Sequence, residues 1–426
     1  MVSMILLASF FLFTAAGFPI AVALGISTLV GLMLQPNVPL VLVAQRMFTA
    51  MDSFPLMALP LFLLAGALMG VGGISRRIIN LSAALVGHIT GGLAHVSILA
   101  SMIFAGISGS AVADTAGIGG IMIPSMIEKK YPRQYAAAVT AAASTIGVII
   151  PPSIPMVICG AMVSVSVGGM FLGGVVPGVI IGLALMAVAY YYARREGYAR
   201  YKRASLKEIL AAFRSAFWAV TMPVAIVGGI VGGVFTPTEA GAVAVLYALV
   251  IGTLVYKELT FKDIVRALWD SALSSAKILF IIGTASLFAW LLTADGFPQL
   301  VGRALLSTTK NPTVMMFIIS GILLVVGTFM ESIAALILLM PVLFPISQQL
   351  GIDSVYFGVI VVIALAIGLV TPPVGVCLYV ATDISRLPLG ATSRALVPFI
   401  AVMMGTLILF LLVPDLILAL PRLLMR

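Results

Sequence analysis

Long apolar stretches and short charged segments alternate along this chain from one end to the other. A helix needs about 20 predominantly apolar residues to cross the hydrocarbon core of a bilayer, and several of the stretches approach that length. Hydrophobic residues make up 62% of the 426 residues and charged residues 9%, whereas a soluble domain carries roughly 25% charged residues. The pattern predicts an all-α polytopic membrane protein, since the alternation typical of an outer-membrane barrel is absent.

Glycine, proline and charge clusters divide the first half of the chain into elements. The predicted order is short spans at 2–17 and 19–34, an interfacial helix at 38–50, a span at 54–73, an amphipathic helix at 75–88, a hairpin at 92–128, a broken span at 134–163 and a span at 168–193. Each arm of the hairpin is too short to cross about 30 Å of hydrocarbon, so we expect it to enter and leave on one side.

The second half retraces this order. The predicted elements are spans at 217–235 and 238–256, an interfacial helix at 260–271, a span at 272–293, a hairpin at 313–348, a broken span at 355–383 and a last span at 393–415. Each half therefore has five crossings and one re-entrant hairpin. Because five is odd, the second copy must insert upside down, and the repeat is predicted to be inverted.

Two segments of the chain carry the same pattern of glycine and proline at a constant offset of 221 positions. The first runs over 106–152 and contains GISGSAVADTAGIGGIMIP and IGVIIPP; the second runs over 327–373 and contains GTFMESIAALILLMPVLFP and IGLVTPP. The residues that recur identically are Gly106, Ala113, Pro124, Tyr135, Ala143, Ile146, Gly147, Pro151 and Pro152. Paired helix interruptions of this kind at membrane depth indicate the binding site of a transporter.

The basic residues test the topology independently. All but five of the 23 Lys and Arg residues lie in five segments, which are 74–77, 128–133, 194–216, 257–277 and 384–394; the exceptions are Arg46, Arg303, Lys310, Arg422 and Arg426. Cytoplasmic loops are enriched in Lys and Arg, so these segments are assigned to the cytoplasm and both termini to the outside. The +9 net charge therefore reflects topology and not nucleic-acid binding, because no basic surface with interleaved aromatic residues accompanies it.

The Pro-Pro breaks carry the candidate chemistry. Pro151-Pro152 and Pro372-Pro373 remove backbone donors and leave carbonyls of the preceding turn without helical partners. Such carbonyls at membrane depth need a polar partner, and they are ligands for a hard cation such as Na⁺. The alternative is that Gly and Pro only kink these helices for packing. Two breaks at one register, each paired with a polar hairpin tip, favour a binding site.

The hairpin tips add oxygen atoms beside the breaks. The first tip supplies the hydroxyls of Ser108 and Ser110, and the second supplies Thr328, followed by Glu331 at the position equivalent to Ser110. Helices that begin at a tip direct backbone N–H groups and a partial positive charge into the protein centre. That arrangement suits an anionic substrate without a buried arginine.

Three acids are candidate transport residues. Asp114 lies one turn beyond the first tip, and Glu331 lies in the second tip. Acids at membrane depth are costly and usually functional, although each could instead hydrogen-bond a loop; Asp114 is expected to orient Ser110 or the substrate. Glu239, in FTPTEAGA, is a candidate on the same ground, with capping of a helix N-terminus as the alternative. Cys159, Cys377, His88 and His95 are assigned no disulfide, metal or catalytic role, and no nucleophile–base pair is visible.

At these motifs the sequence resembles the large membrane subunit of TRAP transporters, the tripartite ATP-independent periplasmic transporters of the C4-dicarboxylate and sialic acid type. The stretches that carry the resemblance are GISGSAVADTAGIG, STIGVIIPPSIPMVICG, TPTEAGAVAV, MESIAALILLMPVLFPI and AIGLVTPPVGVCLYVATDIS. The resemblance implies a Na⁺-coupled elevator in a bacterial inner membrane. It also implies two partners besides the bilayer: a small four-helix membrane subunit on a separate chain, and a periplasmic binding protein that delivers a small organic acid anion.

The resemblance also implies domains and ligands. Transport-domain halves would occupy 92–163 and 313–383, with scaffold and arm helices at 1–91, 164–312 and 384–426. The first Na⁺ site would use Ser108, Gly147, Ile150 and Pro152, and the second would use Gly368, Thr371 and Pro373 with the tip from Thr328 to Met330. The tips read ISGS and TFMES, so the two sites are not chemically equivalent.

Two other classes of function share some of these features. A self-sufficient Na⁺- or H⁺-coupled carboxylate symporter could share the same inverted repeat and would need no binding protein. An intramembrane enzyme is disfavoured, because no acid–base or nucleophilic constellation lies at one depth.

Overall fold

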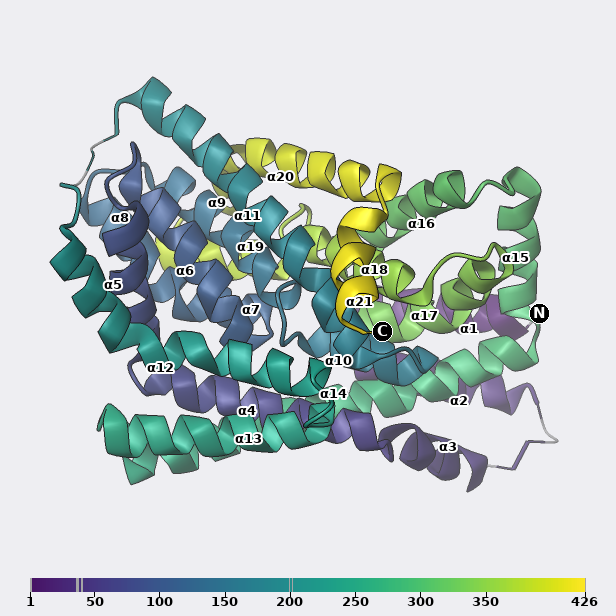
Figure 1. The fold of residues 1–426 in the computed structure, drawn as a ribbon. Coiled ribbons are helices and arrows are strands. Elements are labelled where there is room, and N and C mark those ends of the chain that lie inside the picture. The colour runs from purple at the N-terminus through teal and green to yellow at the C-terminus, as the bar shows by residue number, and fades with distance from the viewer. Residues whose placement is uncertain (1, 36–37, 40, 199, 201, 426) are drawn as a thin grey trace.

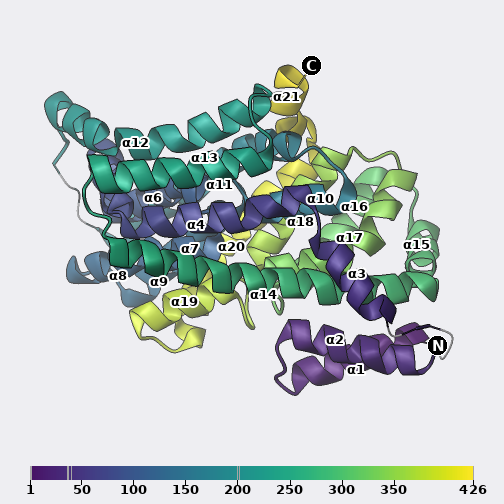
Figure 2. The same cartoon turned by 90° about the horizontal axis from the view of Figure 1, so that it is seen from below.

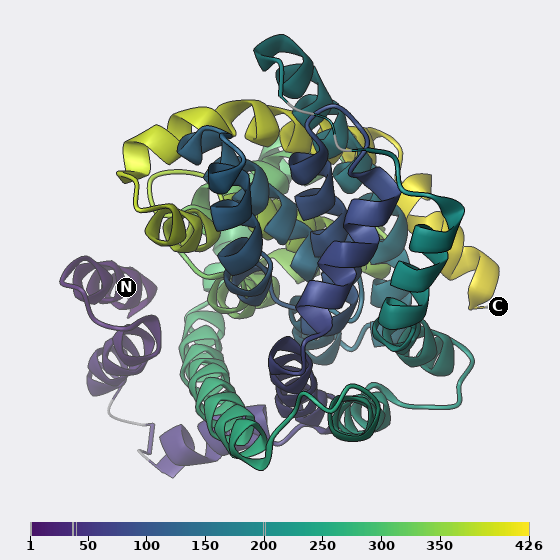
Figure 3. The ribbon, with the colours of Figure 1, turned by 90° about the vertical axis from the view of Figure 1, so that its left-hand side faces the viewer.

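The computed structural model describes residues 2–35, 38–39, 41–198, 200 and 202–425. All regular secondary structure in these residues is helical, and seven of the described helices are long and apolar enough to cross a membrane. Most of the long helices run along one direction (Figure 1), and α1 and α2 lie at the edge of the molecule (Figures 2 and 3). The predicted all-α polytopic fold is confirmed.

The helices of the first half follow the predicted order. They are α1 (Val2–Ala15), α2 (Ile20–Met33), α3 (Val41–Met51), the 3-10 helix η1 (Phe54–Met57), α4 (Ala58–Val71), α5 (Ile74–Val86), α6 (Gly92–Ser108), α7 (Ala111–Gly117), α8 (Gly119–Glu128), α9 (Arg133–Ser144), the 3-10 helix η2 (Thr145–Val148), α10 (Ile154–Val163) and α11 (Val167–Glu196). α6, α7 and α8 form the predicted hairpin, and α9, η2 and α10 form the predicted broken helix. α1 and α2 have 14 residues each; at about 1.5 Å per residue, neither is long enough to cross the hydrocarbon as the predicted spans would.

The second half contains the predicted hairpin and broken helix and two further helices. Its elements are α12 (Leu206–Val231), α13 (Pro237–Val250), the π-helix η3 (Ile251–Val255), α14 (Phe261–Ala294), α15 (Phe297–Thr308), α16 (Pro312–Gly327), α17 (Ser332–Gln349), α18 (Ser354–Gly368), α19 (Val376–Ser385), α20 (Leu389–Leu412) and α21 (Asp415–Leu424). α15 and α21 lie where the sequence analysis predicted no helix. α12 begins inside the segment 194–216 that was predicted to be a loop.

The predicted interfacial helix at 260–271 and span at 272–293 are one continuous helix, α14. In the first half the corresponding elements, α3 and α4, are separated by a turn that contains Pro55. At the repeat offset Pro55 corresponds to Ala276, which keeps its backbone N–H and continues the helix. The prediction of two separate elements was therefore wrong.

The repeat extends beyond the motifs that revealed it. The helix α15, which was missed, lies close to the position that the 221-residue offset assigns to the counterpart of α5. Side-chain contacts repeat as well: the hydroxyl of Tyr135 donates to the carbonyl of Ala189, and the hydroxyl of Tyr356 donates to the carbonyl of Phe410. Both donor and acceptor are related by the same offset, so this tertiary contact is repeated in the two halves.

The two hairpins enter from opposite ends of the molecule, as an inverted repeat requires. α6, α7 and α8 lie towards the left of Figure 1, and α16 and α17 lie towards the right. Each broken helix also contacts the hairpin of the other half, because α10 packs against α17 and α19 packs against α7 and α8. The two hairpins and the two breaks therefore meet in the interior, between the ends of the long helices.

Four of the five predicted cytoplasmic segments are in contact in pairs. Arg77 forms an ion pair with Glu258, which joins the first of these segments to the fourth. The rings of Tyr131 and Tyr198 lie 4.6 Å apart, which joins the second to the third. These contacts are what the charge-based topology requires. Arg426, one of the basic residues assigned to the outer face, lies outside the described residues.

Candidate functional site

The first hairpin tip faces the first broken helix. Ser108 ends α6, and Gly109 follows it in the left-handed conformation with φ of 61°. Ser110 caps α7, since its hydroxyl accepts a hydrogen bond from the N–H of Ala113 over 3.4 Å. After the break, the N–H of Ile154 donates to the carbonyl of Gly109 over 3.2 Å. That bond ties the start of α10 to the tip.

Asp114 is fully buried beneath this tip. The hydroxyl of Ser108 donates to Asp114 Oδ1, whereas Oδ2 has no hydrogen-bond partner among the described residues. Gly147 lies so close that a Cβ added to it would overlap Oδ2, and the same Cβ would be 3.2 Å from the carbonyl oxygen of Ser110. The structure thus brings four predicted site residues together. The carboxylate of Asp114 accepts from the hydroxyl of Ser108 and not from that of Ser110, and its expected role towards the substrate stays a prediction.

Pro152 and Ile150 lie on different sides of the first break. The carbonyl oxygen of Pro152 is 2.7 Å from the position of a Cβ added to Gly109, so this carbonyl faces the hairpin tip. The side chain of Ile150 packs against Gly178 of α11. With Pro151 it lines an apolar cavity of about 350 Å³ between α11, α12 and α21. Only the backbone of Ile150 is therefore available to a cation at the tip.

The second break meets the second tip through an equivalent bond. The N–H of Gly375 donates to the carbonyl of Thr328 over 3.2 Å. The hydroxyl of Thr328 donates to the carbonyl of Val325, and the hydroxyl of Thr371 donates to the carbonyl of Ile367. Each hydroxyl donates its proton to a carbonyl of its own helix. The lone pairs of the hydroxyl oxygen therefore remain available to a cation.

The remaining residues predicted for the second site differ in exposure from those of the first. Gly368 touches the backbone of Gly327, and Met330 is buried in the core. Pro373 is exposed, whereas Pro152, its counterpart in the first half, is buried. The two candidate cation sites therefore differ in access as well as in tip sequence.

Glu331 caps α17 as Ser110 caps α7. Glu331 Oε2 accepts hydrogen bonds from the N–H groups of Ile333 and Ala334 over 2.9 and 3.3 Å, and Ala334 is the counterpart of Ala113 at the repeat offset. The predicted equivalence of the two tip positions is thus confirmed. Neither Glu331 nor Asp114 forms an ion pair within the part of the chain that the structure describes.

A buried polar contact that the sequence did not reveal lies where α7, α9 and α19 meet. The hydroxyls of Thr115 and Ser144 are 2.5 Å apart and fully buried, and the thiol of Cys377, from the second half, lies close to both. Thr115 belongs to α7, Ser144 ends α9 and Cys377 lies in the first turn of α19. The only sequence signal was polar side chains at apolar helix positions, which does not identify their partners.

Glu239 lies in a different part of the structure. Its carboxylate accepts hydrogen bonds from the N–H and the hydroxyl of Thr236, both over 2.8 Å, in a capping box that begins α13. α13 packs mainly against α4 and α12. The capping interpretation of Glu239 is therefore the one that its contacts support.

Comparison with known proteins identifies the family to which this chain belongs. Residues 7–416 match the family model described as the Tripartite ATP-independent periplasmic transporter, DctM component. The chain is 40% identical to the sialic acid TRAP transporter large permease protein SiaM of Vibrio cholerae, with 96% of each chain covered. It is 41% identical to the C4-dicarboxylate TRAP transporter large permease protein DctM of Pseudomonas aeruginosa, with 89% of each chain covered.

Two further likenesses concern chain organisation and fold. The chain is 41% identical to the isethionate TRAP transporter permease protein DctMQ of Oleidesulfovibrio alaskensis; 96% of this chain is covered but only 65% of that protein's length. The YdaH transporter of Alcanivorax borkumensis, whose crystal structure has an unusual topology, shares the fold with a TM-score of 0.58 at 14% identity, over 83% of this chain and 84% of that one. The chain is a multi-pass membrane protein and belongs to the family of the DctM component, the large permease of tripartite ATP-independent periplasmic transporters.

Proposed function

We propose that this protein is the large membrane subunit of a Na⁺-coupled importer of a small organic acid anion. The observation that supports cation coupling is the pair of acids at the hairpin tips, Asp114 and Glu331, which have no basic partner among the described residues. Asp114 is fully buried and Glu331 is half-buried. A carboxylate withdrawn from water without a counter-charge is costly, most of all at Asp114, and a bound cation offsets that cost. Asp114 Oδ2 has no hydrogen-bond partner among the described residues, so it is the carboxylate oxygen that a bound cation would stabilise most.

The first Na⁺ would be held by Ser108 and Ser110 with backbone carbonyls of Gly147, Ile150 and Pro152. The geometry supports this set, since Gly147 and the Ser110 carbonyl converge on Asp114 and the Pro152 carbonyl faces the tip. Unwound backbone in transporters commonly supplies such carbonyl ligands. The charge of Asp114 would balance the ion.

The second Na⁺ would be held by the other tip and break, with ligands from Thr328, Met330, Gly368, Thr371 and Pro373. Two observations support this site. The second break is hydrogen-bonded to the carbonyl of Thr328, and both threonine hydroxyls donate their protons to carbonyls of their own helices, so their oxygen lone pairs can face the ion. Glu331 would supply the negative charge beside this ion.

The anionic substrate would bind between the tips, near helix N-termini. α10, α17 and α19 all begin at a tip or directly after a break, so their first N–H groups and partial positive charges lie in the protein centre. The relatives named above carry sialic acid, C4-dicarboxylates and isethionate according to their names. These compounds are all small organic anions, and we propose a substrate of that class.

We further propose an elevator movement. The transport domain would comprise 92–163 and 313–383, because the two hairpins and the two broken helices pack against one another across the repeat. The segments 1–91, 164–312 and 384–426 would form the scaffold and the arms. A small membrane subunit and a periplasmic binding protein would complete the system, as the tripartite family description supports.

The test is uptake by proteoliposomes that contain this protein, a small subunit and a candidate binding protein. Labelled sialic acid and succinate serve as probes, with a Na⁺ gradient, a proton gradient or neither. We expect uptake that requires both Na⁺ and the binding protein. Equal uptake with a proton gradient in Na⁺-free buffer would contradict Na⁺ coupling, and Na⁺-driven uptake without a binding protein would establish the self-sufficient symporter instead.

A further inference from the structure

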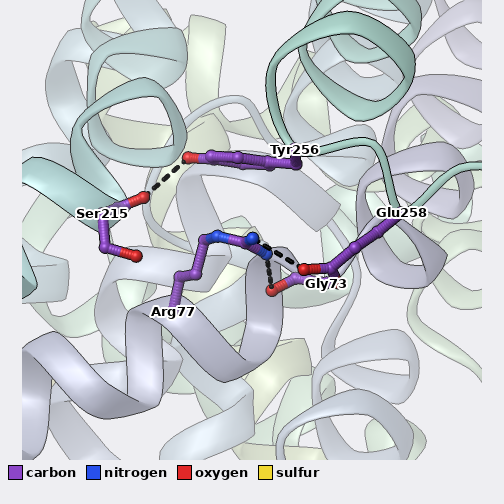
Figure 4. A network of polar contacts seen from close by, with 5 residues as sticks. All are labelled: Gly73, Arg77, Ser215, Tyr256 and Glu258. Atoms are coloured by element: carbon purple, nitrogen blue, oxygen red, sulfur yellow. Dashed lines mark hydrogen bonds and ion pairs between the residues drawn. The ribbon is translucent and has the colours of Figure 1, made fainter.

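A cluster of polar contacts lies at the start of α5, away from the helix breaks (Figure 4). α5 follows α4 after only Gly72 and Gly73. Arg77, in the first turns of α5, donates through Nη1 to the carbonyl of Gly73 over 3.0 Å and through Nη2 to Glu258 Oε1 over 2.6 Å. Arg77 therefore joins the N-terminal end of α5, residues 73–77, to the connection between α13 and α14. We call this end the root of α5.

The same guanidinium also contacts α12 indirectly. Arg77 Cζ lies 3.8 Å from the centroid of the Tyr256 ring, and the hydroxyl of Tyr256 donates to the carbonyl of Ser215 in α12 over 3.0 Å. The side chain of Arg77 is 19% exposed and that of Glu258 is 44% exposed. Because the cation lies between a ring and a carboxylate and is largely shielded from water, these contacts are stronger than an ordinary surface ion pair.

Gly73 makes the arrangement possible. Its φ of 73° lies in the left-handed region, which turns the chain sharply from α4 into α5. A Cβ at this position would overlap the Glu258 carboxylate and lie 2.7 Å from Arg77 Nη1. The turn and the ion pair thus depend on the same residue.

The C-terminal end of α5 lacks the charged contacts that hold its N-terminal end, within the residues that the structure describes. Residues 87–91 lead to α6 and the first hairpin, and within the described chain no ion pair connects them to another element. Gly91, with φ of 78°, sits at the start of α6. Of the two ends of α5, the root is the one fixed by charged contacts.

The second arm shows a related arrangement. α15 also begins at a left-handed glycine, Gly296, and the preceding Asp295 accepts hydrogen bonds from the N–H and the hydroxyl of Ser3 over 2.8 and 2.6 Å. The other end of α15 leads to α16 and the second hairpin. In each half, therefore, a contact with an acid joins the start of the arm to a different helix or connection: the acid is the partner Glu258 in the first half and Asp295 at the start of the arm itself in the second.

We propose that Arg77 is a positioning residue that fixes the root of α5 to the scaffold, so that the arm pivots at residues 87–91 when the first hairpin moves. The inference rests on the proposed elevator movement and adds to it the location of the hinge. Arg77 touches neither cation site, so its loss should slow turnover and leave the apparent affinities for Na⁺ and substrate unchanged.

The first test measures local opening and needs no substrate. Hydrogen exchange of the reconstituted complex should be slower at residues 77–81 than at 87–91. Arg77→Gln should accelerate exchange at 77–81 roughly five-fold, the effect of losing a partly shielded ion pair and ring contact. Arg76→Gln is the matched control, because Arg76 is its exposed neighbour on the same helix. Equal exchange at both ends, or equal effects of both variants, would overturn the proposal.

The second test fixes the start of α5 with a disulfide. A Cβ on Gly72 would lie 3.8 Å from the Cα of Gly252, so Gly72→Cys with Gly252→Cys can form a disulfide, and the native cysteines are buried. We expect the oxidised and reduced forms to take up succinate or sialic acid equally fast. Uptake that stops on oxidation and returns on reduction would place the hinge at the root and overturn the proposal. Failure of the elevator itself is recognised separately, by a hairpin-to-scaffold disulfide that leaves uptake intact.

Discussion

Gly368 and Gly327 are in direct backbone contact: a Cβ added to Gly368 would lie 2.6 Å from both the Cα and the carbonyl carbon of Gly327. Gly368 ends α18 at the second break, and Gly327 ends α16 at the second tip. The contact therefore sets the distance between the two elements that would hold the second Na⁺.

Gly368→Ala should push this tip away from the break, because the added methyl group would overlap the backbone of Gly327. The overlap can be relieved only if α16 or α18 shifts. We expect uptake to fall by at least ten-fold with a higher Na⁺ requirement, since the ligands are no longer within one coordination distance. Gly321→Ala is the control, because its Cβ would meet open space on the same hairpin arm. Na⁺-dependence curves of both variants test this, and unchanged Na⁺ activation in Gly368→Ala would refute it.

Asp114→Ala should abolish uptake and leave insertion and assembly intact. The substitution removes the charge proposed to balance the first cation and leaves the Ser108 hydroxyl without its acceptor. Asp114→Asn keeps an acceptor for Ser108 but not the charge, so it separates the two roles. Uptake by Asp114→Asn close to wild type would show that the charge is dispensable, and purification of the intact complex controls for folding.

Thr115→Val should weaken the packing of α7 against α9. Valine keeps the shape of threonine but cannot bond Ser144, whose hydroxyl keeps its bond to the carbonyl of Ala141, so the loss of one buried hydrogen bond should cost about 1 kcal/mol. We expect a lower thermal unfolding temperature, whereas Thr115→Ser should behave nearly as wild type because it retains the hydroxyl. Equal unfolding temperatures for the valine and serine variants would show that the hydroxyl contributes nothing.

A disulfide between the first hairpin and the scaffold should stop uptake reversibly. A Cβ on Gly106 in α6 would lie 2.8 Å from the Cβ of Pro223 in α12, so Gly106→Cys with Pro223→Cys places the thiols close together. In an elevator these positions must slide apart in each cycle. The reduced form is the control for the substitutions themselves, and full uptake by the oxidised form would rule out the movement.

The Arg77–Glu258 contact should stabilise the protein only above acidic pH. The hydrogen bond and ion pair with Arg77 lower the pKa of Glu258 below its ordinary value of 4.5. The unfolded chain therefore binds this proton more readily, so the stabilisation is present above about pH 4.5 and is lost as the pH falls through the lowered pKa. Unfolding temperatures of wild type and Glu258→Gln should differ at neutral pH and converge in acid; a constant difference would show that the charge of Glu258 is not involved.

The hairpins and the helix breaks were predictable because their signals are local. Pro151-Pro152 and its counterpart end helices wherever they occur, and the repeat offset showed that the two breaks belong together. The same offset would also have predicted α15 from α5. The Gly and Pro positions that recur at this offset begin at Gly106 and Gly327, however, so the repeated motif itself does not reach α15.

An inverted repeat of membrane helices with two polar breaks follows from the sequence alone, since hydrophobic length, Gly and Pro positions and basic loops act through local backbone and solvation preferences. Which groups meet depends on the packing of the folded chain: Asp114 with Ser108 instead of Ser110, Cys377 close to Thr115 and Ser144, and Arg77 with Glu258 and Tyr256. These partners lie on different elements, and their distances depend on how helices from both halves pack. No pattern along a single chain segment contains that information.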